Sequence, residues 1–301
     1  MKPILKYRGG KSKEIPEILR HIPREYNRYI EPFFGGGALY FYLENENSII
    51  NDINTRLMNF YRDVANNYEN MREQLDEIQE IYERNQREYE ELKAVNPDIR
   101  VENMNEDLFY KMRDLFNNNT TNEYLDSVIY FFINKTAYSG MIRYNRRGEF
   151  NVPFGRYKNM NTRLLTENHH RLLRTANIIN TNYQEIFNMA EENDFMFLDP
   201  PYDCQFTDYG NGNEFTEEDH RQLSQAFRNL RCRALMVVSK TPLMEELYED
   251  FIVDDATYDK VYGVNIRNRF ERNAEHLIIR NYDLDIEEQL KFDDEVAVTE
   301  E

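Results

Sequence analysis

The chain has 301 residues, of which 41% are hydrophobic and 31% charged, and its formal net charge is −18. This length can bury a large core, either in one domain or in one domain that carries an inserted second one. There is no apolar stretch of membrane-spanning length and no secretory pattern at the N-terminus, so we expect a soluble, cytoplasmic protein without membrane association. The two cysteines and five histidines show no metal-ligand spacing, and we expect no metal. The pair His169-His170 is expected to lie on the surface of a helix.

The negative charge is concentrated in two segments. Residues 69–107 and residues 283–301 each carry a net charge of −8, whereas residues 1–28 carry +5 and residues 135–174 carry +7. Phosphate binding needs local Lys and Arg side chains and not a basic total. Double-stranded DNA therefore stays a candidate partner, and the acidic total predicts weak non-specific affinity.

The first predicted element is a buried strand at residues 29–33, followed by a glycine-rich turn at 34–39 and a helix at 40–43. In a doubly wound sheet this order brings backbone close to a bound nucleoside. The triple glycine differs from the G-x-G-x-x-G fingerprint, which argues against a dehydrogenase. A second strand at 48–52 ends in Asp52, whose carboxylate could accept hydrogen bonds from ribose hydroxyls.

The middle of the chain is predicted to be helical. Residues 57–116 read as long, charged helices, and residues 78–92 as a solvated helix face with an apolar stripe and no chemical role. An apolar, aromatic helix at 124–133 leads into residues 134–143, and the residues 144–158 that follow are dense in Arg, Asn, Gly and aromatic residues. Such a loop suits a DNA groove, where Arg can bond guanine and an aromatic ring can fill a gap in the stack. The alternative is a β-hairpin on Arg147-Gly148 whose arginines are merely solvated.

A short segment near residue 200 carries the strongest chemical signal. The apolar residues 195–198 predict a buried strand, and Asp199-Pro200-Pro201-Tyr202 follows it directly. The lone pair of an exocyclic amino nitrogen on adenine or cytosine is delocalised, and hydrogen bonds to Asp199 and to the Pro200 carbonyl would localise it. The two prolines fix φ and remove donors, and Tyr202 offers a face for a flipped base. The alternative is a strand that ends in a Pro-Pro turn without chemistry.

The C-terminal part is predicted to complete a mixed sheet. Strands are expected at 234–239, near 251–253 and at 276–280, the last of these in a hairpin with residues near 261–266. The acidic residues 283–301 are expected to form a disordered tail.

These motifs together resemble those of one enzyme family. In order, they are Lys6-Tyr7-Arg8-Gly9-Gly10-Lys11, then Glu31-Pro32-Phe33-Phe34-Gly35-Gly36-Gly37, then residues 143–158, and then Asp199-Pro200-Pro201-Tyr202. The chain is similar to Dam-type DNA adenine N6-methyltransferases, the D12 class or alpha group of enzymes that use S-adenosylmethionine. The resemblance extends to about residue 282, and residues 143–158 are its most specific part.

The resemblance implies an α/β fold. We expect the Rossmann-like mixed sheet of a class I methyltransferase, with an inserted, mainly helical target-recognition domain that carries a β-hairpin. Residues 1–56 and 176–282 would form the catalytic domain that binds S-adenosylmethionine, and residues 57–175 the target-recognition domain. A monomer is expected, with a transient dimer on DNA as the alternative.

The resemblance also implies roles for individual residues. Those expected to bind S-adenosylmethionine are Tyr7, Lys11, Glu31, Phe34, Gly35, Gly36, Gly37, Asp52 and Asp199, and the catalytic residues are Asp199, Pro200, Pro201 and Tyr202. Tyr138 would fill the space left by the flipped adenine, Arg143 and Lys6 would each read a guanine, and Met141 and Pro153 would contact thymine. Further DNA contacts are expected from Arg8, Ser139, Asn145, Arg147, Asn151 and Arg156. Two of these depart from the family pattern, since Ser139 stands where several relatives have Asn and Arg8 replaces a small residue.

The implied reaction is direct methyl transfer to N6 of adenine in duplex 5′-GATC after base flipping. No covalent enzyme intermediate is needed, so the lack of an activated cysteine or serine is expected. Cytosine N4 methylation remains an alternative, because the same two hydrogen-bond acceptors could hold the amino group of either base. A non-catalytic DNA-binding regulator on the same scaffold is the alternative outside enzymes.

Overall fold

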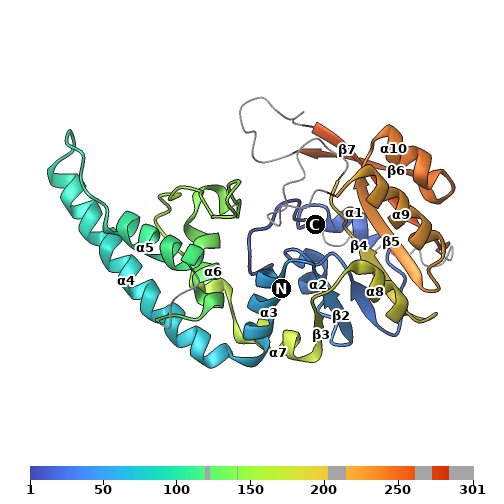
Figure 1. Ribbon diagram of the computed structural model, residues 1–301, viewed down its shortest axis with the longest axis horizontal. Coiled ribbons are helices and arrows are strands. Elements are labelled where there is room, and N and C mark those ends of the chain that lie inside the picture. The colour runs from blue at the N-terminus through green and yellow to red at the C-terminus, as the bar shows by residue number, and fades with distance from the viewer. Residues whose placement is uncertain (119–122, 141, 203–214, 262–272, 285–301) are drawn as a thin grey trace, which may run out of the picture.

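The computed structural model describes residues 1–118, 123–140, 142–202, 215–261 and 273–284 (Figure 1). Within them a seven-stranded sheet runs in the order β3-β2-β1-β4-β5-β7-β6. The first four neighbouring pairs are parallel, and the pairs β5–β7 and β7–β6 are antiparallel. The strands are β1 Tyr29–Glu31, β2 Ser48–Asn51, β3 Asn177–Ile179, β4 Phe195–Leu198, β5 Arg233–Ser239, β6 Ile252–Val261 and β7 Asn273–Arg280. The mixed α/β fold is therefore confirmed.

Strand β4 explains why the sheet needs cover on both faces. Phe195 and Phe197 belong to one hydrophobic cluster, whereas Met196 and Leu198 belong to a second cluster across the sheet. All four residues are buried, as is typical of a central parallel strand. Because β1 pairs with β4 in parallel, the segments that follow these two strands emerge at the same edge of the sheet.

The helices separate into two regions (Figure 1). Helices α4, α5 and α6 extend to one side of the sheet, while α8, α9 and α10 lie beside its strands. The bounds are α1 Ile15–Leu19, α2 Ala38–Leu43, α3 Thr55–Asn66, α4 Tyr68–Val95, α5 Met104–Asn118, α6 Asp126–Thr136, α7 Glu167–Thr175, α8 Tyr183–Met189, α9 Glu217–Arg228 and α10 Pro242–Tyr248. None of the described helices is long and apolar enough to cross a membrane.

The long helix α4 shows how the charged middle of the chain folds. Its buried side chains are Tyr68, Met71, Leu75, Ile78 and Tyr82, which recur every three or four residues and so form one stripe. Beyond Tyr82 the helix has no buried residue. The expectation of a long, charged helix is confirmed, but the apolar stripe lies at residues 68–82 and reaches only the start of the predicted 78–92 face.

Three details differ from expectation or lie outside the described residues. His169 is 4% exposed, not on the surface, because α7 turns it inward, where Nδ1 meets the Thr166 hydroxyl and Nε2 meets the Lys2 carbonyl. Strand β7 pairs with residues 252–261, whereas residues 262–266 of the expected hairpin are not described. Residues 285–301 of the expected tail are also not described.

His21 provides a test of the pH dependence of stability. Burial of its ring, together with the charges of Arg280 and Arg20, lowers its pKa from 6.5 to about 4. Since the unfolded state binds a proton at higher pH, the free energy of unfolding should fall as pH drops from 6.5 to 4. We expect His21→Gln to lessen this loss by on the order of 2 kcal/mol, measured by urea unfolding at several pH values. Parallel pH profiles of the two proteins would contradict the assignment.

Candidate active site and DNA-binding surface

The tetrapeptide after β4 is held by one buried lysine. Lys11 is 2% exposed, and its Nζ donates to Asp199 Oδ1 at 2.6 Å, to the Tyr202 hydroxyl at 2.5 Å and to the Gly9 carbonyl at 3.1 Å. These three acceptors compensate an ammonium group that has lost its water. Asp199 keeps 21% of its side-chain surface exposed. Three predicted site residues, Lys11, Asp199 and Tyr202, therefore meet in one cluster, with Pro200 buried and Pro201 partly buried between the last two.

The glycine turn after β1 packs against an aromatic ring. Gly35 and Gly37 have φ values of +48° and +62°, which L side chains rarely adopt. A Cβ atom on Gly35 would lie 2.8 Å from Cδ1 of Tyr7, and one on Gly36 would lie 3.1 Å from its Cβ. Phe34 points into the core, where its ring contacts Tyr61. The turn thus places Tyr7 directly against the Gly35–Gly36 backbone.

Asp52 connects the ends of two neighbouring strands. Its Oδ2 accepts from the Gly35 amide and its Oδ1 from the Asn54 amide, both at 2.9 Å. Burial raises the pKa of Asp52, and these two amide donors oppose that rise. The carboxyl group predicted to hold a ribose therefore also fixes the glycine turn.

Glu31 adds a second buried carboxyl group at this edge of the sheet. It is 2% exposed, and its Oε2 accepts from the Tyr29 hydroxyl at 2.7 Å. Burial raises the pKa of Glu31 well above its usual range, and the charges of Asp199 and Asp52 raise it further. The carboxyl groups of Asp199 and Asp52 thus both lie within electrostatic range of Glu31, and this environment favours a cationic ligand.

Residues 137–140 and 142–158, the hairpin segment, follow α6 and carry the predicted DNA contacts other than Lys6, Arg8 and Met141. Antiparallel bridges join Ala137 with Phe154 and Tyr144 with Phe150, so the segment has hairpin-like pairing. The Tyr138 amide donates to the Pro153 carbonyl at 2.9 Å, and the Tyr138 side chain is 57% exposed. The exposed predicted contacts are Lys6, Arg8, Tyr138, Arg143, Arg147, Asn151, Pro153 and Arg156, whereas Ser139 and Asn145 are partly buried. Met141 lies outside the described residues.

Asn145 and Arg156 are among the predicted contacts that already have intramolecular partners. The Asn145 Oδ1 accepts from the amides of Arg147 and Glu149 at 2.8 and 3.0 Å, so this side chain shapes the turn. Arg156 has a φ of +55° and donates to Glu106 at 3.3 Å.

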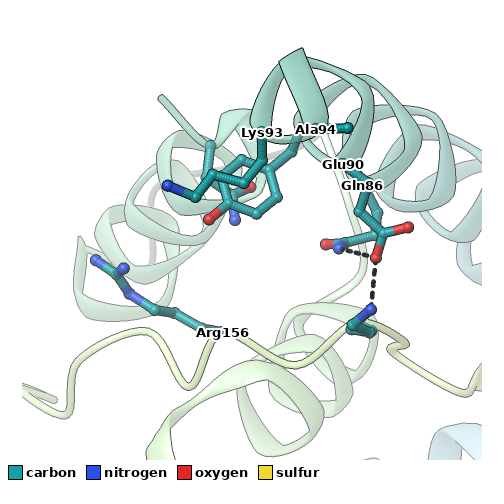
Figure 2. A pocket seen from close by; sticks show the side chains of 8 residues that line it. Gln86, Glu90, Lys93, Ala94 and Arg156 are labelled. Carbon is teal, nitrogen blue, oxygen red and sulfur yellow. Dashed lines mark hydrogen bonds and ion pairs between the residues drawn. The ribbon is translucent and has the colours of Figure 1, made fainter. Parts of the chain in front are cut away.

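Figure 2 shows Arg156 beside a depression of about 360 Å³ between α4 and the hairpin segment. Lys93, Glu90 and Lys158 also line this depression, and Lys158 pairs with Glu90 at 2.9 Å. Its lining contains none of the residues of the glycine turn or the tetrapeptide. Both Arg156 and Lys158 are well exposed, so their ion pairs with the acidic helices are weak.

Sequence reasoning missed the residues that join the N-terminal segment to this surface. Asn134 Oδ1 accepts from the Lys6 amide at 2.9 Å, and its Nδ2 donates to the Lys6 carbonyl at 2.7 Å. The Lys6 ammonium lies 4.3 Å from the centre of the Tyr157 ring, whose hydroxyl accepts from the Ser139 amide. No local pattern identifies Asn134, because an asparagine near a helix end usually reads as a cap.

The fold and site together define a class of protein. A mostly parallel sheet, a glycine turn after one strand and an Asp-Pro-Pro-Tyr segment after its neighbour are consistent with a Rossmann-like methyltransferase. Among the described residues, no group of three or more potential metal ligands occurs.

Comparison with known proteins gives the family. The family model for D12 class N6 adenine-specific DNA methyltransferases matches residues 7–261, and the chain belongs to this family. It is 32% identical over 290 residues to the type II methyltransferase M.CviBI of Paramecium bursaria Chlorella virus NC1A, covering 94% of this chain and 100% of that protein. It is 31% identical over 306 residues to the type II methyltransferase M.MjaIII of Methanocaldococcus jannaschii, covering 94% and 99%. It is 30% identical over 239 residues to the DNA adenine methylase of Haemophilus influenzae, covering 76% and 75%.

The resemblance and the enzyme class inferred from sequence are thus confirmed. The protein is an adenine-specific DNA methyltransferase, and membership of a methyltransferase family implies in general the use of S-adenosylmethionine. The cytosine and regulator alternatives lose their support.

Gly35→Ala should weaken cofactor binding. Its positive φ costs roughly 1–2 kcal/mol for a residue with a Cβ atom, and the new methyl group must also displace the Tyr7 ring. We expect lower stability in urea and weaker binding of S-adenosylmethionine by calorimetry. Gly148→Ala is the matched control, because its φ is +75° but nothing lies within 4 Å of the new Cβ. Equal effects of both variants on cofactor affinity would contradict the role of Tyr7.

Proposed function

We propose that the enzyme methylates N6 of an adenine rotated out of duplex DNA at 5′-GATC, with S-adenosylmethionine as donor. The observation that carries this proposal is the cluster of Lys11, Asp199 and Tyr202 at the carboxyl end of β4. It brings a carboxylate, a proline carbonyl and an aromatic ring together in one short segment, in which Asp199 is 21% exposed and Tyr202 is 7% exposed. A base inside a duplex cannot reach such a segment, which is why flipping is part of the proposal.

The chemistry depends on how the amino group is held. Asp199 Oδ1 is occupied by Lys11, so we assign Oδ2 to accept one amino N–H and the Pro200 carbonyl to accept the other. These two hydrogen bonds draw the nitrogen toward a tetrahedral geometry, in which its lone pair is nucleophilic. Tyr202 stacks on the ring and sets its angle. The cofactor supplies a methyl group made electrophilic by its sulfonium sulfur.

The cofactor site fits a cation that carries a ribose. Asp52 and Asp199 place negative charge near Glu31, so a bound cation would favour the ionised form of Glu31. The absence of side chains on Gly35 and Gly36 leaves room for the Tyr7 ring beside the turn. We assign the ribose to Asp52 and the methionine part to the glycine turn and Lys11. Tyr7 would form one wall of the site.

DNA recognition is assigned to the segment after α6 together with Lys6. Arg143, Pro153 and Tyr138 are exposed on this segment, as base contacts and an intercalating ring require. The target 5′-GATC follows from the family resemblance of Lys6, Tyr138, Met141, Arg143 and Pro153. We further propose residues 57–175 as the recognition domain and residues 1–56 with 176–282 as the catalytic domain, acting as a monomer.

Asp199→Asn should nearly abolish turnover while DNA binding persists. The variant keeps the shape of the side chain but points an N–H donor or a neutral oxygen at the amino group. Loss of such a transition-state contact costs about 100-fold or more in kcat. The measurement combines single-turnover methylation with a DNA-binding titration. Asp250→Ala, which removes an exposed ion pair with Arg228, is the control, and near-normal kcat in Asp199→Asn would overturn the assigned role.

Arg143→Ala should relax discrimination at one base pair. A bidentate contact to guanine is worth about 1–3 kcal/mol against the wrong base, so kcat/KM should fall on GATC and hardly change on the corresponding near-cognate site. Arg156→Ala is the comparison, since a phosphate contact weakens binding on all sequences and lowers the salt slope by about 1. Equal losses on every sequence for Arg143→Ala would make Arg143 a phosphate contact as well.

A further inference from the structure

A buried carboxylate from the N-terminal segment joins the two antiparallel strands at the end of the sheet. Glu14 follows Lys11 by one turn, and its amide donates to the Lys11 carbonyl at 2.8 Å. Its Oε2 accepts from the Tyr258 hydroxyl on β6 at 2.6 Å and from Nδ1 of His276 on β7 at 2.7 Å. Glu14 is 4% exposed and His276 is fully buried. A polar group is rarely placed this deep without a specific role.

The same histidine touches the proposed base-stacking residue. The His276 ring meets the Tyr202 ring edge-on, with centroids 5.2 Å apart and an interplanar angle of 78°. Tyr258 packs on His276 at 5.5 Å, directly opposite it in the strand register. Because a carboxylate can only accept, we assign the proton to Nδ1 of His276, and this hydrogen bond to Glu14 fixes the rotation of the imidazole.

Two residues of the N-terminal segment thus act on Tyr202, Lys11 directly and Glu14 through His276. Lys11 donates to its hydroxyl, and Glu14 fixes the histidine that packs on its ring. We propose that Glu14, His276 and Tyr258 are positioning residues that set the plane of Tyr202 for the flipped base. This inference rests on the proposed function, because the plane of Tyr202 matters only if a base stacks on it.

The charge of Asp199 also reaches this cluster. Burial and the Glu14 carboxylate raise the pKa of Tyr258, and the Asp199 carboxylate adds to that rise. The cluster therefore lies within electrostatic range of the catalytic carboxylate as well as in contact with Tyr202. If Glu14, His276 and Tyr258 served only to stabilise the fold, they would not need to contact the segment Asp199-Pro200-Pro201-Tyr202.

The test compares Glu14→Gln and His276→Phe with the wild type. His276→Phe keeps an aromatic edge against Tyr202 but removes the donor to Glu14. The single-turnover rate at saturating DNA and S-adenosylmethionine should fall about 10- to 100-fold, as expected for a misplaced reactant. Dissociation constants for both ligands should change by less than about twofold, because the loss affects the reacting geometry and not ground-state binding.

A second readout follows the base itself. With 2-aminopurine at the target adenine, saturating wild-type enzyme should raise fluorescence as the base leaves the stack. The variants should raise it further, since a tilted Tyr202 quenches the flipped base less. Glu14→Leu/Tyr258→Phe/His276→Phe guards against misfolding, because a buried polar group replaced as a whole by apolar residues usually leaves a stable fold. Its rate should fall no more than that of the worse single variant, as expected for residues that act as one unit.

His169→Phe is the matched control, because this buried histidine also loses its side-chain hydrogen bonds but lies on α7. It should lower the melting temperature and leave the single-turnover rate and the fluorescence unchanged. Wild-type rates in Glu14→Gln, His276→Phe and the triple variant would overturn the inference, as would losses that only follow stability, like those of His169→Phe. Absence of adenine methylation or of a fluorescence rise in the wild-type enzyme would instead contradict the proposed function.

Discussion

The ammonium group of Lys11 is the constraint on which the rest of the site depends. A charge that is 2% exposed must be compensated by the protein, and Asp199, Tyr202 and the Gly9 carbonyl supply that compensation. Asp199 is 188 residues away in sequence, so this one group determines how the N-terminal segment lies on the sheet. Removing either partner would leave a buried charge uncompensated, which couples the geometry of the site to the stability of the fold.

Strand β1 pairs in parallel with both β2 and β4, so the segments that follow these three strands lie at one edge of the sheet. The glycine turn follows β1, Asp52 follows β2 and Asp199 follows β4, so their functional groups emerge side by side. Asp52 then fixes the turn through the Gly35 amide. The charges of Asp199 and Asp52 both raise the pKa of Glu31, and the sulfonium proposed to bind there would favour its ionised form.

The parts of this account that depend on local patterns could be predicted from sequence. Continuous apolar runs identify β4 and β5. The Asp-Pro-Pro-Tyr segment and the glycine turn can also be identified, because the residues that define each of them are adjacent in the sequence. Strand β3 was missed because it has only three residues and none is buried. Asn134 and the Glu14–His276 pair were missed for another reason, since their partners lie 128 and 262 residues away. Likewise, periodicity could not show that α7 turns His169 inward.

Methyl transfer to defined duplexes would test the proposed reaction and its target site together. Labelled S-adenosylmethionine would be incubated with one duplex that contains a single GATC and with one in which that site is scrambled, followed by nucleoside mass spectrometry. The account predicts N6-methyladenine in the GATC duplex alone. Equal methylation of both duplexes would contradict the recognition surface described for the hairpin segment. No methylation of either duplex across a range of salt concentrations would contradict the assigned chemistry itself.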